Sequence, residues 1–347
     1  MSDPEALRAQ LDRIERRVAE TQAIAGRAYE LAADWPAQLA EVRAADDYAA
    51  AWEDPEPLIT IRIATYDNAR LLTERTLPSV LRQTYDRWEA VVVGDACEDD
   101  TATRIEALGD PRIRFTNLPV RGPYPDDEKQ RWHVAGTAPA NAGLAAARGA
   151  WIAPLDHDDE FADDHLEQLL AAARASRAEL VYGKLALWHE EAGAMLGHEI
   201  GAWPPRYGMF GFQAAIFHAG LRRFRYDLNT RFLDEPGDWN MARRWWEMGV
   251  RFQFLDRVVG TIHYVPKEPW ARAWAADQLR QLDAAGRLPA GVTAPAPPAP
   301  PLPDEADALR AELAEVRGTL AAIERSASWR LTAPLRAVKR RAGARRR

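Results

Sequence analysis

A short apolar run near the middle of the 347-residue chain, Trp151-Ile-Ala-Pro-Leu155, is followed without a break by Asp156-His-Asp-Asp-Glu160. The run predicts a buried strand, and ligands of parallel α/β sheets bind beyond the carboxyl ends of such strands. Neighbouring carboxylates repel one another unless a cation is present, and oxygen ligands suit Mg²⁺ or Mn²⁺, which in turn bind diphosphates. The segment therefore predicts a divalent-cation site at a sheet edge. The structural alternative is an acidic loop before a helix that Asp163 or Asp164 would cap.

Two further strand-like runs end in residues that can carry chemistry. Leu58-Ile-Thr-Ile-Arg-Ile63 is followed by Ala64-Thr-Tyr66, and Ala90-Val-Val-Val93 is followed by Gly94-Asp95. A carboxylate such as Asp95 can accept a hydrogen bond from a nucleobase, while Thr65 and Tyr66 offer a hydroxyl and an aromatic face. Ordinary packing of Tyr66 is the alternative.

The three runs belong to a longer alternation of strand-like and helix-like segments between residues 55 and 265. This rhythm predicts one α/β domain, built on a mostly parallel sheet with helices on both faces. Outside it, residues 1–50 carry a heptad seam, residues 286–303 form a Pro-rich linker, and residues 304–347 hold a second seam before a basic tail. The two seams would pair with each other or form a homodimer.

Charge and cysteine content bound the partners and the compartment. The net charge is −7, but eight basic and no acidic residues lie between Arg330 and Arg347, so the remaining residues carry −15. An acidic body disfavours nucleic acid, whereas the tail predicts either contact with an anionic membrane surface or simple solvation. The single cysteine, Cys97, excludes an internal disulfide and a cysteine-based zinc site, and no membrane-length apolar run or secretory signal is visible. We therefore expect a cytoplasmic protein, peripheral at the inner membrane face if its tail binds there.

Five segments of the α/β region, taken in order, resemble the family 2 glycosyltransferases, which have the GT-A fold. The resemblance covers about residues 57–265, and Ser328-Trp-Arg-Leu-Thr-Ala-Pro-Leu-Arg336 is similar to a tail seen after coiled coils in bacterial polysaccharide glycosyltransferases. Gly94 and Gly237 depart from the pattern, because the family has acidic residues there. The five segments are Pro57–Asn68, Leu77–Tyr85, Val91–Thr101, Asn141–Asp159 and Gly237–Trp245.

The resemblance implies transfer of a sugar from a UDP-, dTDP- or GDP-linked donor to a hydroxyl of a saccharide or lipid-linked acceptor, with inversion, in cell-surface polysaccharide synthesis. Asp238 would be the general base, since an inverting displacement needs a group that takes the proton of the acceptor hydroxyl. A Mn²⁺ or Mg²⁺ ion would neutralise the departing diphosphate. The resemblance assigns the donor to Ala64, Thr65, Tyr66, Asp95, Asn141 and Asp156, and the metal to Asp158 and Asp159 with His263 as a further ligand.

These assignments have alternatives in ordinary structure. Asp238 can cap the helix that follows it, and His263 can be an internal histidine of a strand. The aromatic stretch Trp203–Phe212 would either line the acceptor side or pack in the core. For the whole chain, the alternative is a catalytically silent scaffold that assembles partners through its coils.

Overall fold

The structure is a computed structural model and describes residues 34–265, 269–288 and 291–296. The heptad seam of residues 304–347, the basic tail and most of the N-terminal seam lie outside the described residues, and the Pro-rich linker lies outside them in part. Within the described part of the N-terminal segment, α2 (Trp35–Arg43) and α3 (Ala50–Glu53) pack on the α/β domain. The guanidinium of Arg43 lies 2.7 Å from the carboxylate of Glu179 and ties α2 to the sheet.

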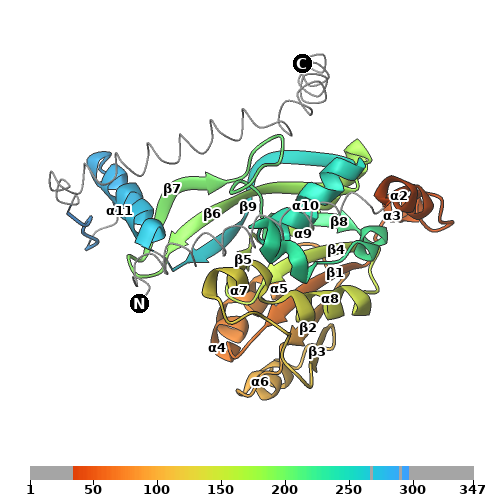
Figure 1. Cartoon of the computed structure of the whole chain (residues 1–347), viewed down its shortest axis with the longest axis horizontal. Coiled ribbons are helices and arrows are strands. Elements are labelled where there is room, and N and C mark those ends of the chain that lie inside the picture. The colour runs from red at the N-terminus through yellow and green to blue at the C-terminus, as the bar shows by residue number, and fades with distance from the viewer. Residues whose placement is uncertain (1–33, 266–268, 289–290, 297–347) are drawn as a thin grey trace, which may run out of the picture. The chain divides into compact units, whose positions relative to one another are not determined.

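One half of the sheet is parallel. Its strands follow the order β3-β2-β1-β4, and every residue of β2 is buried (Figure 1). This agrees with the continuous apolar runs, because a strand covered on both faces needs no polar alternation. The strands are β1 (Ile59–Thr65), β2 (Trp88–Gly94), β3 (Ile113–Asn117) and β4 (Trp151–Asp156).

The other half of the sheet is mixed, which corrects the expectation of a mostly parallel sheet. Beyond β4 the order continues β8-β6-β9-β5, and β7 pairs with the outer part of β6. The β4–β8, β8–β6, β6–β7 and β9–β5 pairs are antiparallel, while β6 and β9 run parallel. The strands are β5 (Glu160–Phe161), β6 (Leu180–His189), β7 (Ala194–Ile200), β8 (Ala215–His218) and β9 (Phe252–Tyr264).

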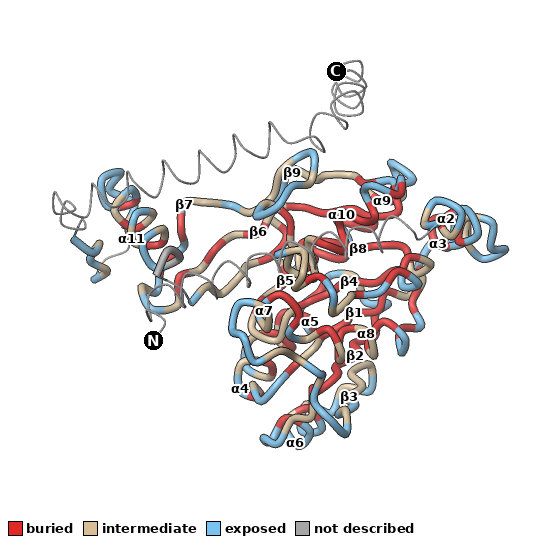
Figure 2. Tube along the Cα trace, in the orientation of Figure 1, coloured by how far each residue is buried: buried red, intermediate tan, exposed pale blue. Residues whose placement is uncertain are grey.

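Helices cover both faces of the sheet, as predicted. Side chains of α5 and α9 share one buried core with alternate residues of β1, and side chains of α2, α8 and α10 share a second core with β8. Figure 2 shows buried residues along the central strands and exposed ones on the outer sides of α2, α6 and α11. The helices are α4 (Ala69–Leu71), α5 (Leu77–Leu81), α6 (Thr101–Ala107), α7 (Glu128–Val134), α8 (Thr137–Ala146), α9 (His165–Ser176), α10 (Gly237–Met248) and α11 (Pro269–Ala284).

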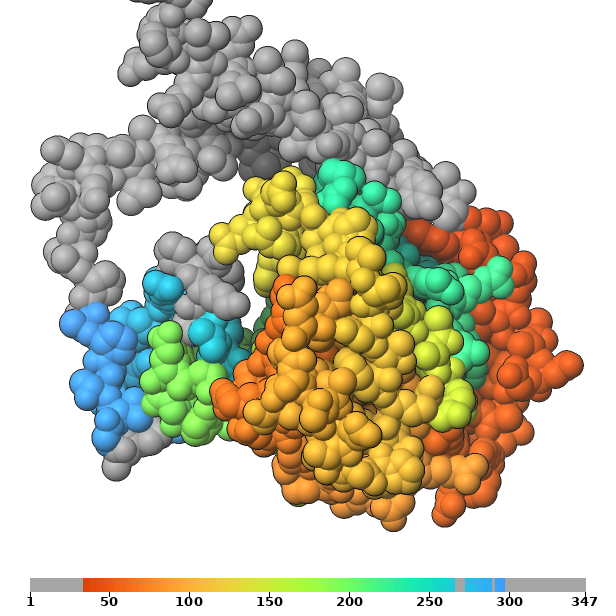
Figure 3. All heavy atoms as spheres, turned by 90° about the horizontal axis from the view of Figure 1, so that it is seen from below, coloured from red at the N-terminus to blue at the C-terminus, as the bar shows by residue number. Residues whose placement is uncertain are grey.

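Seen from below, the surface is formed mainly by the parallel half of the domain, drawn in orange and yellow (Figure 3). Between α4 and α5 the chain makes a π-helical turn, Leu72–Thr76, so this helical stretch is continuous but not uniform. Within the part of the chain that the structure describes, every helix is too short or too polar to cross a membrane.

Candidate active site

The three polar strand ends lie side by side, as the sequence predicts. In the parallel ladder Thr65 is level with Gly94, and Ala64 is level with Asp156. The backbone N–H of Asp95 donates to the carbonyl oxygen of Thr65 at 2.9 Å. Residues from three segments that are far apart in the sequence therefore lie together at one edge of the sheet.

The predicted base-binding residues contact the loop that follows β3. Asp95 is buried, and its Oδ1 accepts the backbone N–H of Gly122 at 3.0 Å. The guanidinium carbon of Arg121 lies 3.7 Å from the centre of the Tyr66 ring. Burial, together with the nearby charge of Asp95, raises the pKa of Tyr124. This loop thus covers both the carboxylate and the aromatic face that the sequence assigns to a nucleobase.

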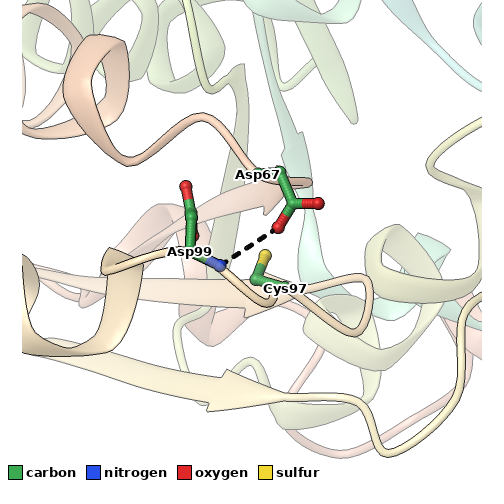
Figure 4. Close-up of side chains that lie close together, drawn as sticks. All are labelled: Asp67, Cys97 and Asp99. Carbon is green, nitrogen blue, oxygen red and sulfur yellow. Dashed lines mark hydrogen bonds between the residues drawn. The ribbon is translucent and has the colours of Figure 1, made fainter.

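Asp67, Cys97 and Asp99 lie together beside this loop edge (Figure 4), with ligand atoms within 4.8 Å of one another. The carboxylate of Asp67 accepts the backbone N–H groups of Glu98 and Asp99, and Asp99 accepts that of Ala69. Burial raises the pKa of the Cys97 thiol, so it stays protonated near neutral pH. The cluster therefore pins the turns after β1 and β2 against each other.

Asp156 and Asp159 are joined by a residue that the sequence analysis did not single out. The side-chain N–H group of Gln213 donates to Asp156 Oδ2 at 2.5 Å and to Asp159 Oδ2 at 3.2 Å. The other amide atom, Gln213 Oε1, is buried and has no hydrogen-bond partner. A lone glutamine outside every strand-end motif gives no sequence signal for this bridge.

The electrostatics of this edge fit a cation. Burial, together with the charge of Asp158, raises the pKa of Asp156, although Arg62 opposes the shift. Burial and the charges of Asp156 and Asp158 raise the pKa of Asp159 well above its usual range. Carboxylates whose charges raise one another's pKa, together with the unpartnered amide oxygen of Gln213, offer the oxygen ligands that Mg²⁺ or Mn²⁺ prefers.

His263 has a different environment from the one expected of a metal ligand. Its Nδ1 lies 2.7 Å from Glu190 Oε1, and its Nε2 lies 2.7 Å from Glu160 Oε2. Its backbone N–H donates to Asp159 Oδ1 at 2.9 Å. Carboxylates thus engage both ring nitrogens of His263, while its main chain holds the Asp159 carboxylate. A role of His263 as a metal ligand stays a prediction.

Asp238 lies in the first turn of α10, next to the strand-end carboxylates. Its carboxylate accepts hydrogen bonds from the Tyr226 hydroxyl and from the backbone N–H of Phe212. Burial, and then the charge of Asp156, raises the pKa of Asp238 to about 7, while Arg62 acts in the opposite direction. A carboxyl group with such a pKa can take up a proton near neutral pH.

Asn141 supports Asp238 from behind. Its side-chain amide donates to the carbonyl oxygen of Tyr226 and accepts the N–H of Tyr226, both at 3.0 Å. Arg62 donates to the Tyr226 hydroxyl at 3.2 Å, and the absence of a side chain at Gly143 leaves room for the Arg62 stem, because a Cβ there would lie 2.7 Å from Arg62 Cγ. The Asn-Ala-Gly segment of α8 therefore fixes the tyrosine that contacts Asp238, and the amide that we expected at the donor is used for this purpose.

The two glycines that depart from the family pattern have structural reasons. A Cβ on Gly94 would lie 2.4 Å from Asn117 Oδ1, and the Asn117 amide bonds the backbone N–H and carbonyl groups of Cys97. A Cβ on Gly237 would lie 3.3 Å from the Tyr226 ring. At each position, a neighbouring side chain occupies the space next to the glycine that an acidic side chain would enter.

Part of the chain is similar to known glycosyltransferases. Residues 130–230 match the family model of glycosyl transferase family 2. The succinoglycan biosynthesis protein ExoO of Rhizobium meliloti is 36% identical over 133 residues, which are 38% of this chain and 34% of that protein. The UDP-Glc:alpha-D-GlcNAc-diphosphoundecaprenol beta-1,3-glucosyltransferase WfgD of Escherichia coli is 31% identical over 127 residues, 36% of this chain and 45% of that protein. The matches therefore span less than half the length of these relatives.

Two solved structures are similar in fold. S. aureus TarS in complex with UDP-GlcNAc is 16% identical, covering 64% of this chain and 66% of that chain with a TM-score of 0.48. The mannosyltransferase PcManGT from Pyrobaculum calidifontis, solved with GDP-Man and Mn²⁺, is 20% identical, covering 92% and 96% with a TM-score of 0.45. The α/β domain of this chain is therefore similar to family 2 glycosyltransferases over residues 130–230, and its curated relatives include a glucosyltransferase.

Proposed function

We propose that this chain transfers a sugar from a nucleotide diphosphate-sugar to a hydroxyl of a saccharide acceptor, with inversion at the anomeric carbon. The observation that carries the proposal is the Asp238 carboxyl, whose pKa of about 7 and whose partners Tyr226 and Phe212 suit a base. In the transfer, the acceptor oxygen attacks the anomeric carbon and the bond to the diphosphate breaks. The hydroxyl proton goes to Asp238.

The donor would bind across the strand ends. Asp95, Tyr66 and Thr65 face the nucleobase side, while Ala64 and Asp156 lie level with each other in adjacent strands. The backbone N–H of Gly122 donates to Asp95, and Arg121 stacks on Tyr66. A nucleobase can therefore bind to Asp95 and Tyr66 only if the loop gives up these two contacts. Donor binding should therefore be coupled to a movement of this loop.

A divalent ion would be held by Asp156, Asp158 and Asp159, which are half-buried or buried on one short segment. When bound, such an ion supplies charge neutralisation for the leaving diphosphate. The chain's own residues prepare the site, because Gln213 and the main chain of His263 orient the Asp159 carboxylate.

The names of the relatives favour a role in surface polysaccharide synthesis, since ExoO is a succinoglycan biosynthesis protein and WfgD is named for a diphosphoundecaprenol-linked acceptor. For this chain, the nucleotide-sugar donor, the saccharide acceptor and a divalent ion, Mn²⁺ or Mg²⁺, are all parts of the proposal. Binding of the tail to an anionic membrane and dimerisation through the coils concern residues outside the described ranges and stay predictions.

The test is a thermal-shift panel of UDP, dTDP, GDP and CDP, each with and without Mn²⁺. A ligand that binds only the native state raises the melting temperature. We expect one nucleotide to raise it in the presence of the metal, and Asp158→Ala to abolish that rise.

Transfer from the matching nucleotide-sugar should then fall at least a thousandfold in Asp238→Asn with an unchanged melting temperature. Asp234→Asn, an exposed carboxylate four residues earlier, is the matched control and should retain transfer. If no nucleotide shifts the wild type, the scaffold interpretation gains and the proposed function is wrong.

A further inference from the structure

Four aromatic side chains form a row that leads away from the candidate base. The segment that ends at Phe212, whose N–H contacts Asp238, runs back along α10. The ring of Tyr207 lies 6.3 Å from that of Trp239, and the ring of Trp203 lies 5.5 Å from that of Trp246. We call Trp203, Tyr207, Trp239 and Trp246 the aromatic strip.

Three of the four rings are open to solvent, whereas Trp239 is half-buried and packs against the core. Trp203 is 53% exposed, Tyr207 57% and Trp246 41%, whereas large apolar side chains of soluble proteins are mostly covered. Exposed aromatic groups that adjoin one another mark binding surfaces more often than isolated ones do. The strip therefore needs an occupant.

The geometry of α10 gives the strip a length. Trp239 and Trp246 are seven residues apart, so they lie on the same side of the helix about 10 Å from each other. A single sugar ring is shorter than this span. A ligand that contacts both aromatic pairs must be extended.

The polar groups between the two pairs suit a saccharide better than a lipid. Arg243, one turn after Trp239, contacts Glu235 at 2.7 Å and Glu247 at 3.1 Å. With two carboxylates and one guanidinium, this cluster keeps one net negative charge: its carboxylate oxygens can accept hydrogen bonds from sugar hydroxyls, and the net charge disfavours anionic headgroups. The C–H faces of sugar rings pack on the negative faces of aromatic rings.

We propose that the aromatic strip binds the acceptor as an oligosaccharide, with the residue next to the reacting sugar at Tyr207 and Trp239 and a more distant one at Trp203 and Trp246. The proposal rests on the proposed function, because the strip begins beside Asp238. It names the acceptor class, an extended saccharide rather than a single sugar. Since α10 carries both the base and the strip, an acceptor held on the strip would present its end to Asp238.

The test is binding of the full-length chain to an array of bacterial polysaccharide fragments from one to six sugars long. We expect wild-type chain to retain some fragments of three or more sugars at least tenfold more strongly than their monosaccharides. Trp203→Ala and the double variant Trp203→Ala/Trp246→Ala should lose that preference. The control Trp274→Ala, which removes an aromatic of α11 packed on Tyr264 and His198, should keep it.

Equal retention of long fragments by wild type and the double variant would overturn the proposal, as would a wild type that retains no fragment at all. Sedimentation with vesicles of phosphatidylglycerol and phosphatidylcholine serves as the second arm. A loss of vesicle binding in the double variant, without a change on the array, would assign the strip to a membrane instead.

Array binding needs neither donor nor catalysis, so the two proposals can fail separately. Asp238→Asn should bind fragments like wild type. If nucleotides bind and the double variant still discriminates fragment length, the strip assignment is wrong while the proposed function stands. If no nucleotide binds but the double variant loses the long fragments, the strip is a saccharide site of a protein that is not a transferase. Trp203→Phe, which keeps a ring at the most exposed position, should retain binding and excludes a folding defect as the cause.

Discussion

At the residue scale, Tyr226 is the point where the supports of the candidate base meet. Asn141 fixes its backbone on both sides, Arg62 donates to its hydroxyl, and the hydroxyl contacts Asp238. Burial alone would raise the pKa of Asp238 still further, because the charged carboxylate is disfavoured away from water. The charge of Arg62, the backbone N–H of Phe212 and the hydrogen bond from Tyr226 oppose this together and keep the pKa near 7.

Replacing Tyr226 by Phe should therefore move the acidic limb of the transfer rate to higher pH. The carboxylate form accepts the proton, so the rate rises with pH through the pKa of Asp238. A hydrogen bond to a charged group contributes about 1.5–3 kcal/mol, which corresponds to a displacement of roughly one to two pH units. The measurement is the pH profile of kcat at saturating donor. Tyr85→Phe, which removes a hydroxyl bonded to the Pro57 carbonyl, should leave the limb in place; a limb equally unmoved in Tyr226→Phe would contradict the assignment.

The carboxylates of the site could be named from the sequence because they follow apolar runs, whereas their supporting residues could not. Tyr226 and Gln213 reach the site from segments without a periodic pattern. Arg62 gave a usable signal, since a charged residue inside a buried strand needs a partner. For Asn141 the sequence shows a polar side chain near the strand ends but not the direction in which its amide points, so its role at the donor stays a prediction.

At the element scale, Glu89 joins three neighbouring pieces of the parallel half. It lies on β2, and its carboxylate accepts hydrogen bonds from Thr60 on β1, Arg114 on β3 and Arg148 after α8. These partners outweigh its burial and lower the pKa of Glu89 to about 2. The carboxylate is therefore charged at all physiological pH values.

Glu89→Gln should lower the free energy of unfolding by about 1.5–3 kcal/mol, because it removes a buried charged acceptor from its hydrogen bonds with Thr60, Arg114 and Arg148. Urea denaturation at pH 7 measures the change. Asp100→Asn removes an exposed partner of Arg104 and should cost less than about 1 kcal/mol. A cost for Glu89→Gln no larger than for Asp100→Asn would show that the three elements do not depend on this carboxylate.

The elements of the parallel half were predictable because long apolar runs bounded by polar residues identify their strands. Strands β5 and β8 are too short to contain a long apolar run, and β7 contains none because buried and more exposed residues alternate along it. Strand β9 has exposed and half-buried positions along most of its length, so its 13 residues did not read as one strand. Helix α9 is also predictable from the sequence, since Leu166, Leu169, Leu170 and Ala173 recur at helical spacing.

At the scale of the whole molecule, the order of the strands could be inferred only where the pattern is repetitive. Alternation of strand and helix implies parallel neighbours, and that holds for β1 to β4. After β4 the chain returns through antiparallel pairings between segments far apart in sequence. Such pairings depend on which surfaces remain uncovered once the first half has formed, and local sequence does not encode that.

His165 ties α9 to β5 and β9 in the mixed half of the sheet, and its burial makes the stability of the domain depend on pH. Its ring stacks on Phe161 of β5 with ring centres 3.7 Å apart, and its Nδ1 lies 2.8 Å from the Val259 carbonyl oxygen of β9. It is the first residue of α9 and is fully buried. Burial lowers the pKa of His165 to about 3, so the folded domain keeps the ring neutral.

Since the folded pKa lies below the ordinary value of 6.5, the unfolded chain takes up a proton first as the pH falls. The contribution of His165 to stability is therefore complete above pH 6.5 and decreases from there to about pH 3, by up to about 1.4 kcal/mol per pH unit. His165→Gln can still donate to the Val259 carbonyl but does not titrate. Urea denaturation between pH 7 and pH 4.5 should give a smaller loss of stability per pH unit in His165→Gln than in wild type. Because carboxylates titrate equally in both proteins, the difference between the two slopes isolates the histidine, and equal slopes would mean that the ring can be protonated without unfolding.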